Sequence, residues 1–287
     1  MLRRRSGLIG LAACAAVLLA PQQALAKGPT APPIYRGVSY GPSPSELATV
    51  YAQNKPGAMI VVLVHGGGWR LQTLPIEDST EAKALQKQGY AVFDINFAQD
   101  SPSEPAFPLE TGQVAAATEW AIAHAAAYDA NPANVVLFGG SSGGQLVARV
   151  AEQLDAAAPG TVQAVVSLSG PMNFLTLLPM VANGTIKDKP FILSIGQALG
   201  CTGQLASCSP AFEAEWSPAL HIPEGGCPDW LLFSSEVDVA ETAQGQEMLA
   251  DLSAAGCRAT LDVMPSGHGF SLWPAVASPV YSFLAGE

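Results

Sequence analysis

A serine between glycines lies where a predicted strand meets a predicted helix. Residues 140–144 read Gly-Ser-Ser-Gly-Gly, after the apolar run 135–138 and before the helical pattern 145–150. A strand, a sharp Gly-x-Ser-x-Gly turn and a helix are typical of a nucleophile elbow, which exposes its serine at the helix N-terminus. Glycine and serine also form linkers, but a linker would not lie between a buried strand and an apolar helix. The pattern predicts that Ser142 is a nucleophile.

Three glycines follow a second buried strand, upstream of the elbow. Residues 59–64 are continuously apolar, and residues 65–69 read His-Gly-Gly-Gly-Trp. Glycines let backbone N–H groups point into a cavity, where each donor can stabilise the oxyanion of a tetrahedral intermediate by roughly 3–4 kcal/mol. Alone, the run is equally typical of a tight turn. Together with the elbow, it predicts an oxyanion loop.

An acid and a histidine complete a possible triad in the chain order Ser, acid, His. Residues 234–238, Ser-Ser-Glu-Val-Asp, follow the short apolar strand 230–233, and His268 lies between glycines after the strand 261–264. Functional groups of open α/β sheets collect at the carboxyl ends of strands. We therefore expect His268 to be the base and Asp238, in preference to Glu236, to be the orienting acid.

The elements that must position these groups alternate along the chain. Strands are predicted near 59–64, 91–95, 135–139, 163–168, 229–234 and 260–264, and helices near 79–88, 112–127, 143–156, 241–255 and 275–284. This alternation predicts an α/β protein with a mostly parallel sheet covered on both faces. Residues 171–228 predict a small insertion over the active site, with short helices near 173–181 and 189–199. We expect the apolar residues of this insertion to pack as a lid or as an acyl pocket. The alternative interpretation is that the insertion is a structural loop.

These motifs resemble the α/β-hydrolase fold, and more narrowly its hormone-sensitive-lipase and acetyl-xylan or feruloyl esterase-like (BD-FAE-like) branch. That branch carries a similar oxyanion loop, elbow and His-Gly-Phe end. The likeness covers most of the chain, since residues 38–41 and 47–51 look like its first two strands and residues 215–218 like its Ser-Pro signature. The resemblance implies the following site residues: a triad of Ser142, Asp238 and His268, oxyanion-hole amides of Gly67, Gly68 and Gly143, and substrate contact by Trp69.

The chain departs from this branch at four residues. Phe97-Ala98 stands where the branch has Tyr-Arg, and Gln113 stands where it has Asp. Loss of both charges together indicates a paired structural replacement. Ser235 replaces the glycine before the acid loop, next to the turn that carries Asp238.

The N-terminus predicts export. Residues 3–5 are arginines, residues 8–20 are apolar but too short to span a bilayer, and Ala24-Leu25-Ala26 is a small-x-small cleavage site. The prediction is a signal peptide at 1–26 and a catalytic domain at 27–287 in a secreted or periplasmic protein. Lipoprotein processing at Cys14 is the less favoured alternative. The net charge of −11 becomes −14 without the leader, which argues against nucleic acid and an anionic membrane as partners. No other segment is long enough to be a membrane helix, so we expect no stable membrane insertion after cleavage.

Four cysteines follow the leader, and export makes disulfides the expected state. Cys227 and Cys257 precede two strands that we expect to be neighbours, whereas Cys201 and Cys208 share one loop. We predict the pairs 227–257 and 201–208. Zinc is the competing interpretation, but Cys-x-x-Cys pairs are missing.

The sequence therefore predicts a secreted serine carboxylesterase that needs no metal or organic cofactor. Its substrate would be a small-molecule or polysaccharide-linked ester. The alternatives are a lipase, an aryl-formamidase-like hydrolase, or a non-catalytic binding module with a hydrolase fold.

Overall fold

The computed structural model describes residues 31–70, 79–100, 105–201, 205–223, 226–240 and 242–286. The predicted signal peptide and its alternative cleavage site at Cys14 lie outside these residues. The chain divides into a unit of residues 1–31 and a unit of residues 32–287. All helices and strands of the described residues belong to the second unit.

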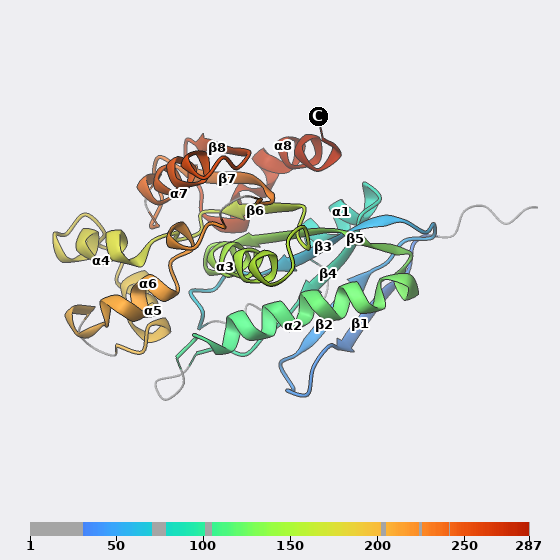
Figure 1. Cartoon of the computed structure of the whole chain (residues 1–287), viewed down its shortest axis with the longest axis horizontal. Coiled ribbons are helices and arrows are strands. Elements are labelled where there is room, and N and C mark those ends of the chain that lie inside the picture. Colours follow the sequence, from blue (N-terminus) through green and yellow to red (C-terminus); the bar gives the residue numbers. More distant parts are fainter. Residues whose placement is uncertain are drawn as a thin grey trace, which may run out of the picture. The chain divides into compact units, whose positions relative to one another are not determined.

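The described residues form one eight-stranded sheet (Figure 1). Its strands are β1 (Ile34–Ser39), β2 (Leu47–Tyr51), β3 (Ala58–Val64), β4 (Ala91–Ile95), β5 (Ala130–Gly140), β6 (Ala164–Leu168), β7 (Asp229–Ser235) and β8 (Ala259–Met264). They lie in the order β1-β2-β4-β3-β5-β6-β7-β8, antiparallel for β1–β2 and β2–β4 and parallel for all later neighbours. The mostly parallel α/β sheet predicted from the sequence is confirmed.

Helices cover both faces of this sheet. They are α1 (Thr80–Lys87), α2 (Leu109–His124), α3 (Ser142–Ala157), α7 (Thr242–Ala254) and α8 (Trp273–Ala285), with 3-10 turns η1 (Ala125–Tyr128) and η4 (Gly269–Leu272). Successive residues of β3 show the two faces, because Val62 packs in a core with α2, α3 and α7 whereas Val61 packs in a core with α1 and α8. Burial on both faces explains why the central strands are apolar without alternation.

An insertion of short helices separates β6 from β7. It comprises α4 (Phe174–Ala182), α5 (Lys189–Ala198), η2 (Leu205–Ser207), α6 (Pro210–Glu215) and η3 (Pro218–Leu220). The helices α4, α5 and α6 lie together in Figure 1, next to the end where β6 finishes. Gln244 of α7 anchors the start of the insertion, because its Oε1 accepts hydrogen bonds from the amides of Met172 and Asn173.

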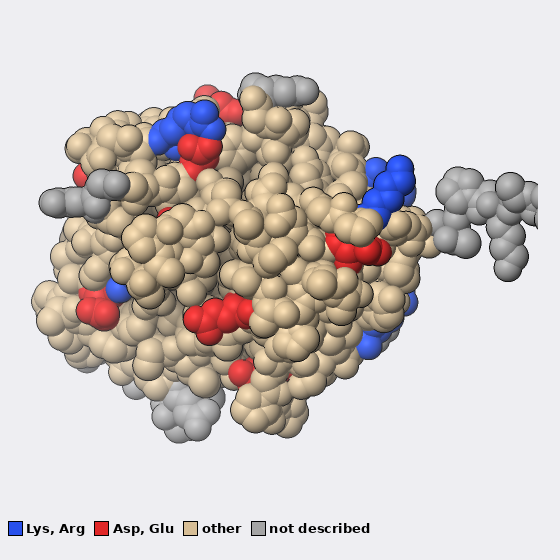
Figure 2. All heavy atoms as spheres, turned by 45° about the vertical axis from the view of Figure 1, so that its right-hand side comes forward, with Lys and Arg blue, Asp and Glu red and all other residues tan. Residues whose placement is uncertain are grey.

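Charge is sparse on the surface. Only 13% of the residues are charged, and on the face drawn in Figure 2 the basic and acidic side chains stand in small separate groups. A phosphate backbone is bound by clustered Lys and Arg. The described residues of that face show only small groups of basic side chains.

Candidate active site

The turn between β5 and α3 places a serine in a strained conformation. Ser141 follows the last residue of β5 and has φ 57° and ψ −126°. A positive φ is uncommon for a residue with a side chain, and such strain gathers at functional sites. The Ser141 Oγ lies 2.7 Å from Nε2 of His268. Ser141 therefore has the geometry of a nucleophile at an elbow.

This geometry corrects the prediction of Ser142. Ser142 is the first residue of α3, and it is 2% exposed. The sequence contains two overlapping Gly-x-Ser-x-Gly patterns, residues 139–143 and 140–144, and the structure uses the first. The physical reason is the length of β5, because the strand continues through Gly140 and leaves Ser141 at the bend.

Gly143 has a packing role that the sequence prediction missed. A Cβ atom at Gly143 would collide with the backbone carbonyls of Val64 and His65, so only glycine lets α3 approach β3 this closely. The amide that directly follows the nucleophile belongs to Ser142. Because a helix's first amides have no intrahelical acceptor, the Ser142 amide replaces that of Gly143 as the candidate donor.

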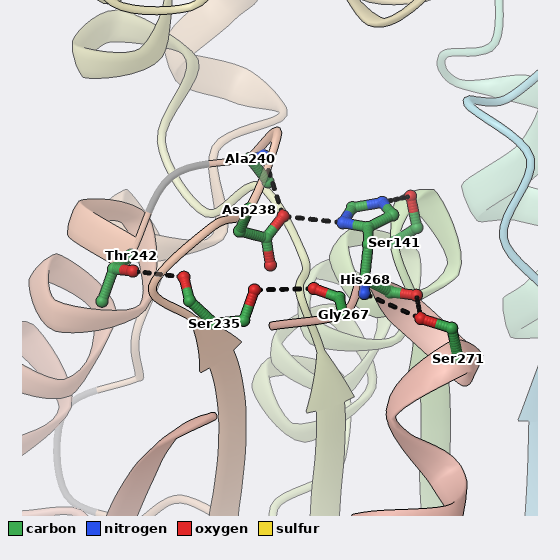
Figure 3. A network of polar contacts seen from close by, with 8 residues as sticks. All are labelled: Ser141, Ser235, Asp238, Ala240, Thr242, Gly267, His268 and Ser271. Carbon is green, nitrogen blue, oxygen red and sulfur yellow. Dashed lines mark hydrogen bonds and ion pairs between the residues drawn. The ribbon is translucent and has the colours of Figure 1, made fainter. Parts of the chain in front are cut away.

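His268 and Asp238 lie in line with Ser141 (Figure 3). The Nδ1 of His268 is 2.7 Å from Oδ1 of Asp238, and the same oxygen accepts a hydrogen bond from the Ala240 amide at 3.0 Å. Burial alone would raise the pKa of Asp238, but hydrogen bonding and charge from His268, with smaller contributions from Ser169 and Ala240, lower it. Asp238 is therefore an ionised partner for the imidazole. Glu236, the alternative acid, is exposed.

The unusual Ser235 connects the acid loop to the histidine loop. Its hydroxyl donates a 2.6 Å hydrogen bond to the carbonyl of Gly267, the residue before His268. Its own carbonyl accepts a 2.6 Å hydrogen bond from the Thr242 hydroxyl (Figure 3). A glycine at this position would lack the first bond. The departure from the family pattern thus adds a contact beneath Asp238 and His268.

The glycine loop after β3 lies against the elbow. Gly67 and Gly68 have φ of 137° and 63°, values that favour glycine. A Cβ at Gly66 would come within 2.7 Å of the Gly140 carbonyl oxygen, which shows how closely the loop approaches the Ser141 turn. On its other side, a Cβ at Gly68 would come within 2.7 Å of Ser194 Oγ in α5. The insertion therefore contacts the candidate oxyanion loop.

Trp69 does not lie at the surface of the site, contrary to the prediction that it contacts substrate. It is 2% exposed, and its indole Nε1 donates a 3.1 Å hydrogen bond to Gln145 Oε1. Its ring packs against those of Phe107 and Phe174. Trp69 thus connects the glycine loop to α3 through its hydrogen bond with Gln145. The glycines before Trp69 do not predict from the sequence in which direction its ring points.

His65 and the replaced ion pair have structural roles. His65 stacks on Phe97 with a ring-centroid distance of 4.4 Å. Burial lowers the pKa of His65 by more than its hydrogen bonds with Gly66 and Asn96 raise it. Gln113 Oε1 accepts a 2.6 Å hydrogen bond from the Ala98 amide. A neutral hydrogen bond therefore joins the two positions where the resembling branch carries opposite charges.

A small cavity adjoins the acid loop. Its volume is about 190 Å³, and its walls are residues 185–188 of the insertion and residues 237–239. Asp238 belongs to its lining, so the insertion and the acid loop enclose space next to the candidate triad.

Both cysteine pairs lie at disulfide distance. The Cα atoms of Cys227 and Cys257 are 5.8 Å apart, and those of Cys201 and Cys208 are 4.9 Å apart. The first pair precedes β7 and β8, which are parallel neighbours as expected. Within the described ranges, no group of three or more His, Cys, Asp or Glu side chains could hold a metal ion. None of the helices described is long and apolar enough to cross a membrane.

The comparisons with known proteins agree with this architecture. A truncated carbohydrate esterase from gut microbiota superposes with a TM-score of 0.75 at 20% identity, over 91% of this chain and 99% of the other. Esterase B from Lactobacillus rhamnosis gives a TM-score of 0.70 at 18% identity, over 88% and 84%. The metagenomic thermostable carboxylesterase EstE1 gives 0.68 at 22% identity, over 83% and 82%. At these identities the likeness establishes the fold.

The sequence comparisons place the chain in a family. No curated protein is significantly similar in sequence. The BD-FAE family model matches residues 49–252, which run from β2 into α7 and include the glycine loop, the elbow and Asp238. The matched residues make up more than half of the chain. Its open, mostly parallel sheet agrees with the carboxylic ester hydrolases among its structural relatives. The chain therefore belongs to the BD-FAE family.

Proposed function

We propose that the protein is a serine carboxylesterase with Ser141 as its nucleophile. The observation that carries the proposal is the continuous chain from Ser141 Oγ through His268 to Asp238, with 2.7 Å at each of the two contacts. A hydroxyl, an imidazole and a buried carboxylate in this order are the parts of an acyl-transfer triad. The esterases named among the structural relatives support the same reaction class.

In the proposed reaction, Ser141 attacks the acyl carbonyl while Nε2 of His268 accepts the hydroxyl proton. Asp238 holds the imidazole in the required tautomer and stabilises the imidazolium. Collapse of the tetrahedral intermediate breaks the ester bond, and His268 returns the proton to the leaving alkoxide. Water then attacks the acyl-enzyme with His268 as base, which releases the acid and regenerates Ser141.

Backbone amides are proposed to hold the oxyanion. The candidates are those of Gly67 and Gly68 on the glycine loop and of Ser142 at the start of α3. The close approach of Gly66 to the elbow supports this arrangement, since it places the loop beside the nucleophile. Preset donors of this kind require no reorganisation during the reaction.

A short acyl or alcohol group is the substrate part that the site supports best. The cavity of about 190 Å³ beside Asp238 is small, and its wall is mixed, with polar Thr185 and Lys187 beside apolar Ile186. One observation favours a lipase as the second candidate: an apolar groove of about 880 Å³ runs between α4, α5 and α6. Its lining residues do not include the proposed triad.

We further propose that the protein is exported. The sequence at 1–26 has the order of a signal peptide. Two cysteine pairs at disulfide distance support an oxidising compartment, because disulfides persist there and are rare in the cytosol. Edman sequencing of the protein isolated from the cell envelope or the medium should give Lys27 as the N-terminal residue.

An organophosphonate probe tests the enzyme class and the nucleophile together. The probe should label the protein stoichiometrically, and peptide mapping should place the adduct on Ser141. A series of p-nitrophenyl esters from acetate to palmitate should show the highest kcat/KM for short acyl chains, whereas a maximum at palmitate would favour the lipase. Absence of both labelling and hydrolysis would indicate a binding module.

A further inference from the structure

Ser169, the first residue after β6, has a backbone conformation that its residue type disfavours. Its φ is 57°, and it is 3% exposed. A left-handed conformation at a buried non-glycine residue must be imposed by its surroundings, and such outliers gather where function requires them. Glycine would adopt this conformation without strain. The side chain of Ser169 therefore needs an explanation.

Backbone contacts place Ser169 between the nucleophile and the acid. Its amide donates a 2.8 Å hydrogen bond to the carbonyl of Phe233 in β7, the strand that leads to Asp238. The preceding residue, Leu168, accepts a 2.7 Å hydrogen bond from the amide of Ser141. Leu168 and Ser169, which are consecutive at the end of β6, thus bond to the nucleophile and to the strand before the acid.

The carboxylate of Asp238 has one occupied and one unoccupied oxygen. Oδ1 accepts hydrogen bonds from His268 and Ala240, and Figure 3 shows Oδ2 turned away from the imidazole. Oδ2 of Asp238 and Oγ of Ser169 are both shielded from solvent, and neither atom has a hydrogen-bond partner among the described residues. The side chain of Ser169 is one of the groups that lower the pKa of Asp238.

We propose that Ser169 is a positioning residue, whose hydroxyl donates to Oδ2 of Asp238 and fixes the carboxylate against Nδ1 of His268. Buried polar atoms are generally hydrogen-bonded, and this bond satisfies two of them together. It also prevents the carboxylate from rotating away from the imidazole. The proposal rests on the proposed esterase function and adds a fourth side chain to it.

The role predicts a particular kinetic signature. Because Ser169 acts through Asp238 and not on the substrate, its loss should lower kcat and leave KM unchanged. Hydrogen bonds to charged groups contribute enough that the loss should lower kcat by about 10- to 100-fold.

Two substitutions separate the hydroxyl from the strained backbone. Ser169→Ala removes the hydroxyl and keeps the strain, whereas Ser169→Gly removes both. Equal losses of kcat in the two variants support the proposal, and wild-type kcat in either one overturns it. Ser167→Ala is the matched control, because Ser167 lies buried two residues earlier on β6 and its hydroxyl faces Gly144 of α3.

A spectroscopic measurement on the free protein avoids dependence on the substrate. The proton on Nδ1 of His268 should give a downfield NMR resonance that Asp238→Asn removes. Ser169→Ala and Ser169→Gly should shift or broaden this resonance, and Ser167→Ala should leave it in place. An unchanged resonance in both Ser169 variants overturns the proposal. Absence of ester hydrolysis by the wild type, with the resonance shifted as expected, would refute the esterase function and not the positioning bond.

Discussion

Strands β7 and β8 are held together differently at their two ends. Before the strands, Cys227 and Cys257 lie at disulfide distance, and Arg258 Nε contacts Asp229 Oδ1 at 2.9 Å. Beyond the strands, the described parts of the two loops meet through hydrogen bonds, among them those of Ser235 with Gly267 and of Asp238 with His268. One end is cross-linked, and the other is polar and adjustable.

This difference indicates that the strand pair supports catalysis at one end and stability at the other. A cross-link at the catalytic end would restrict the small movements that a proton-transferring histidine makes. At the opposite end it restricts the unfolded chain without touching the site. Changes beyond the strands should therefore alter activity, and changes before them should alter stability.

Ser141→Ala should give the largest effect at the catalytic end. We expect kcat to fall by about 10⁶ with an unchanged melting temperature, because the triad acts as a unit. Steady-state kinetics and circular dichroism measure the two quantities. Ser142→Ala is the matched control and should keep activity within a few-fold of wild type; the reverse result would restore the register predicted from the sequence.

Asp238→Asn should rank second, with a loss of about 10⁴ in kcat, because an amide selects the wrong imidazole tautomer. Glu236→Gln should change kcat little, since Glu236 is exposed and Asp238, two residues later, is the acid that contacts His268. Comparable losses in both variants would contradict the assignment of the acid.

The double variant Cys227→Ala/Cys257→Ala tests the cross-linked end. The pair closes a loop of 30 residues, for which the chain-entropy model gives on the order of 3–4 kcal/mol. Differential scanning calorimetry should show a melting temperature lower by roughly 10 °C, with wild-type kcat at low temperature. Arg258→Ala, which breaks an exposed ion pair, should change the free energy of unfolding by less than about 1 kcal/mol. A large loss of kcat in the double variant would show that the two ends are coupled.

Ser235→Ala should produce the smallest of these effects. It removes the hydrogen bond to the Gly267 carbonyl, and a contact of this kind contributes about 1 kcal/mol. We expect kcat to fall several-fold while KM stays constant. Ser234→Ala controls for burial, because Ser234 is the preceding residue of β7 and its hydroxyl faces Gly245 of α7. Equal kinetics in the two variants would remove Ser235 from the support of the histidine loop.

The fold was predictable because its signals are local and repeated. Apolar runs such as residues 59–64 and 135–139 can be buried only inside a sheet covered on both faces, and Ser79 caps α1 through the Ala82 amide. The adjacency of β7 and β8 followed from alternation, and the proximity of Cys227 and Cys257 followed from the adjacency. The short α6 lacked a strong pattern of its own.

The site was less predictable because its details depend on single-residue offsets. Two adjacent serines satisfy the same glycine spacing, and only the end of β5 at Gly140 selects Ser141. The orientation of Trp69 depends on Gln145 and Phe174, which no motif connects to it. Ser169 lies outside every motif, and its backbone angle carries no sequence signal.

The contact between Ser194 and Gly68 limits how this enzyme can diversify. The insertion that borders the cavity beside Asp238 also lies against the proposed oxyanion loop, so one segment, residues 185–198, adjoins both. A chimera that exchanges residues 171–228 for those of a relative must keep a small side chain opposite Gly68. A bulkier residue there would displace the loop, and the new substrate range would come with a slower acyl transfer.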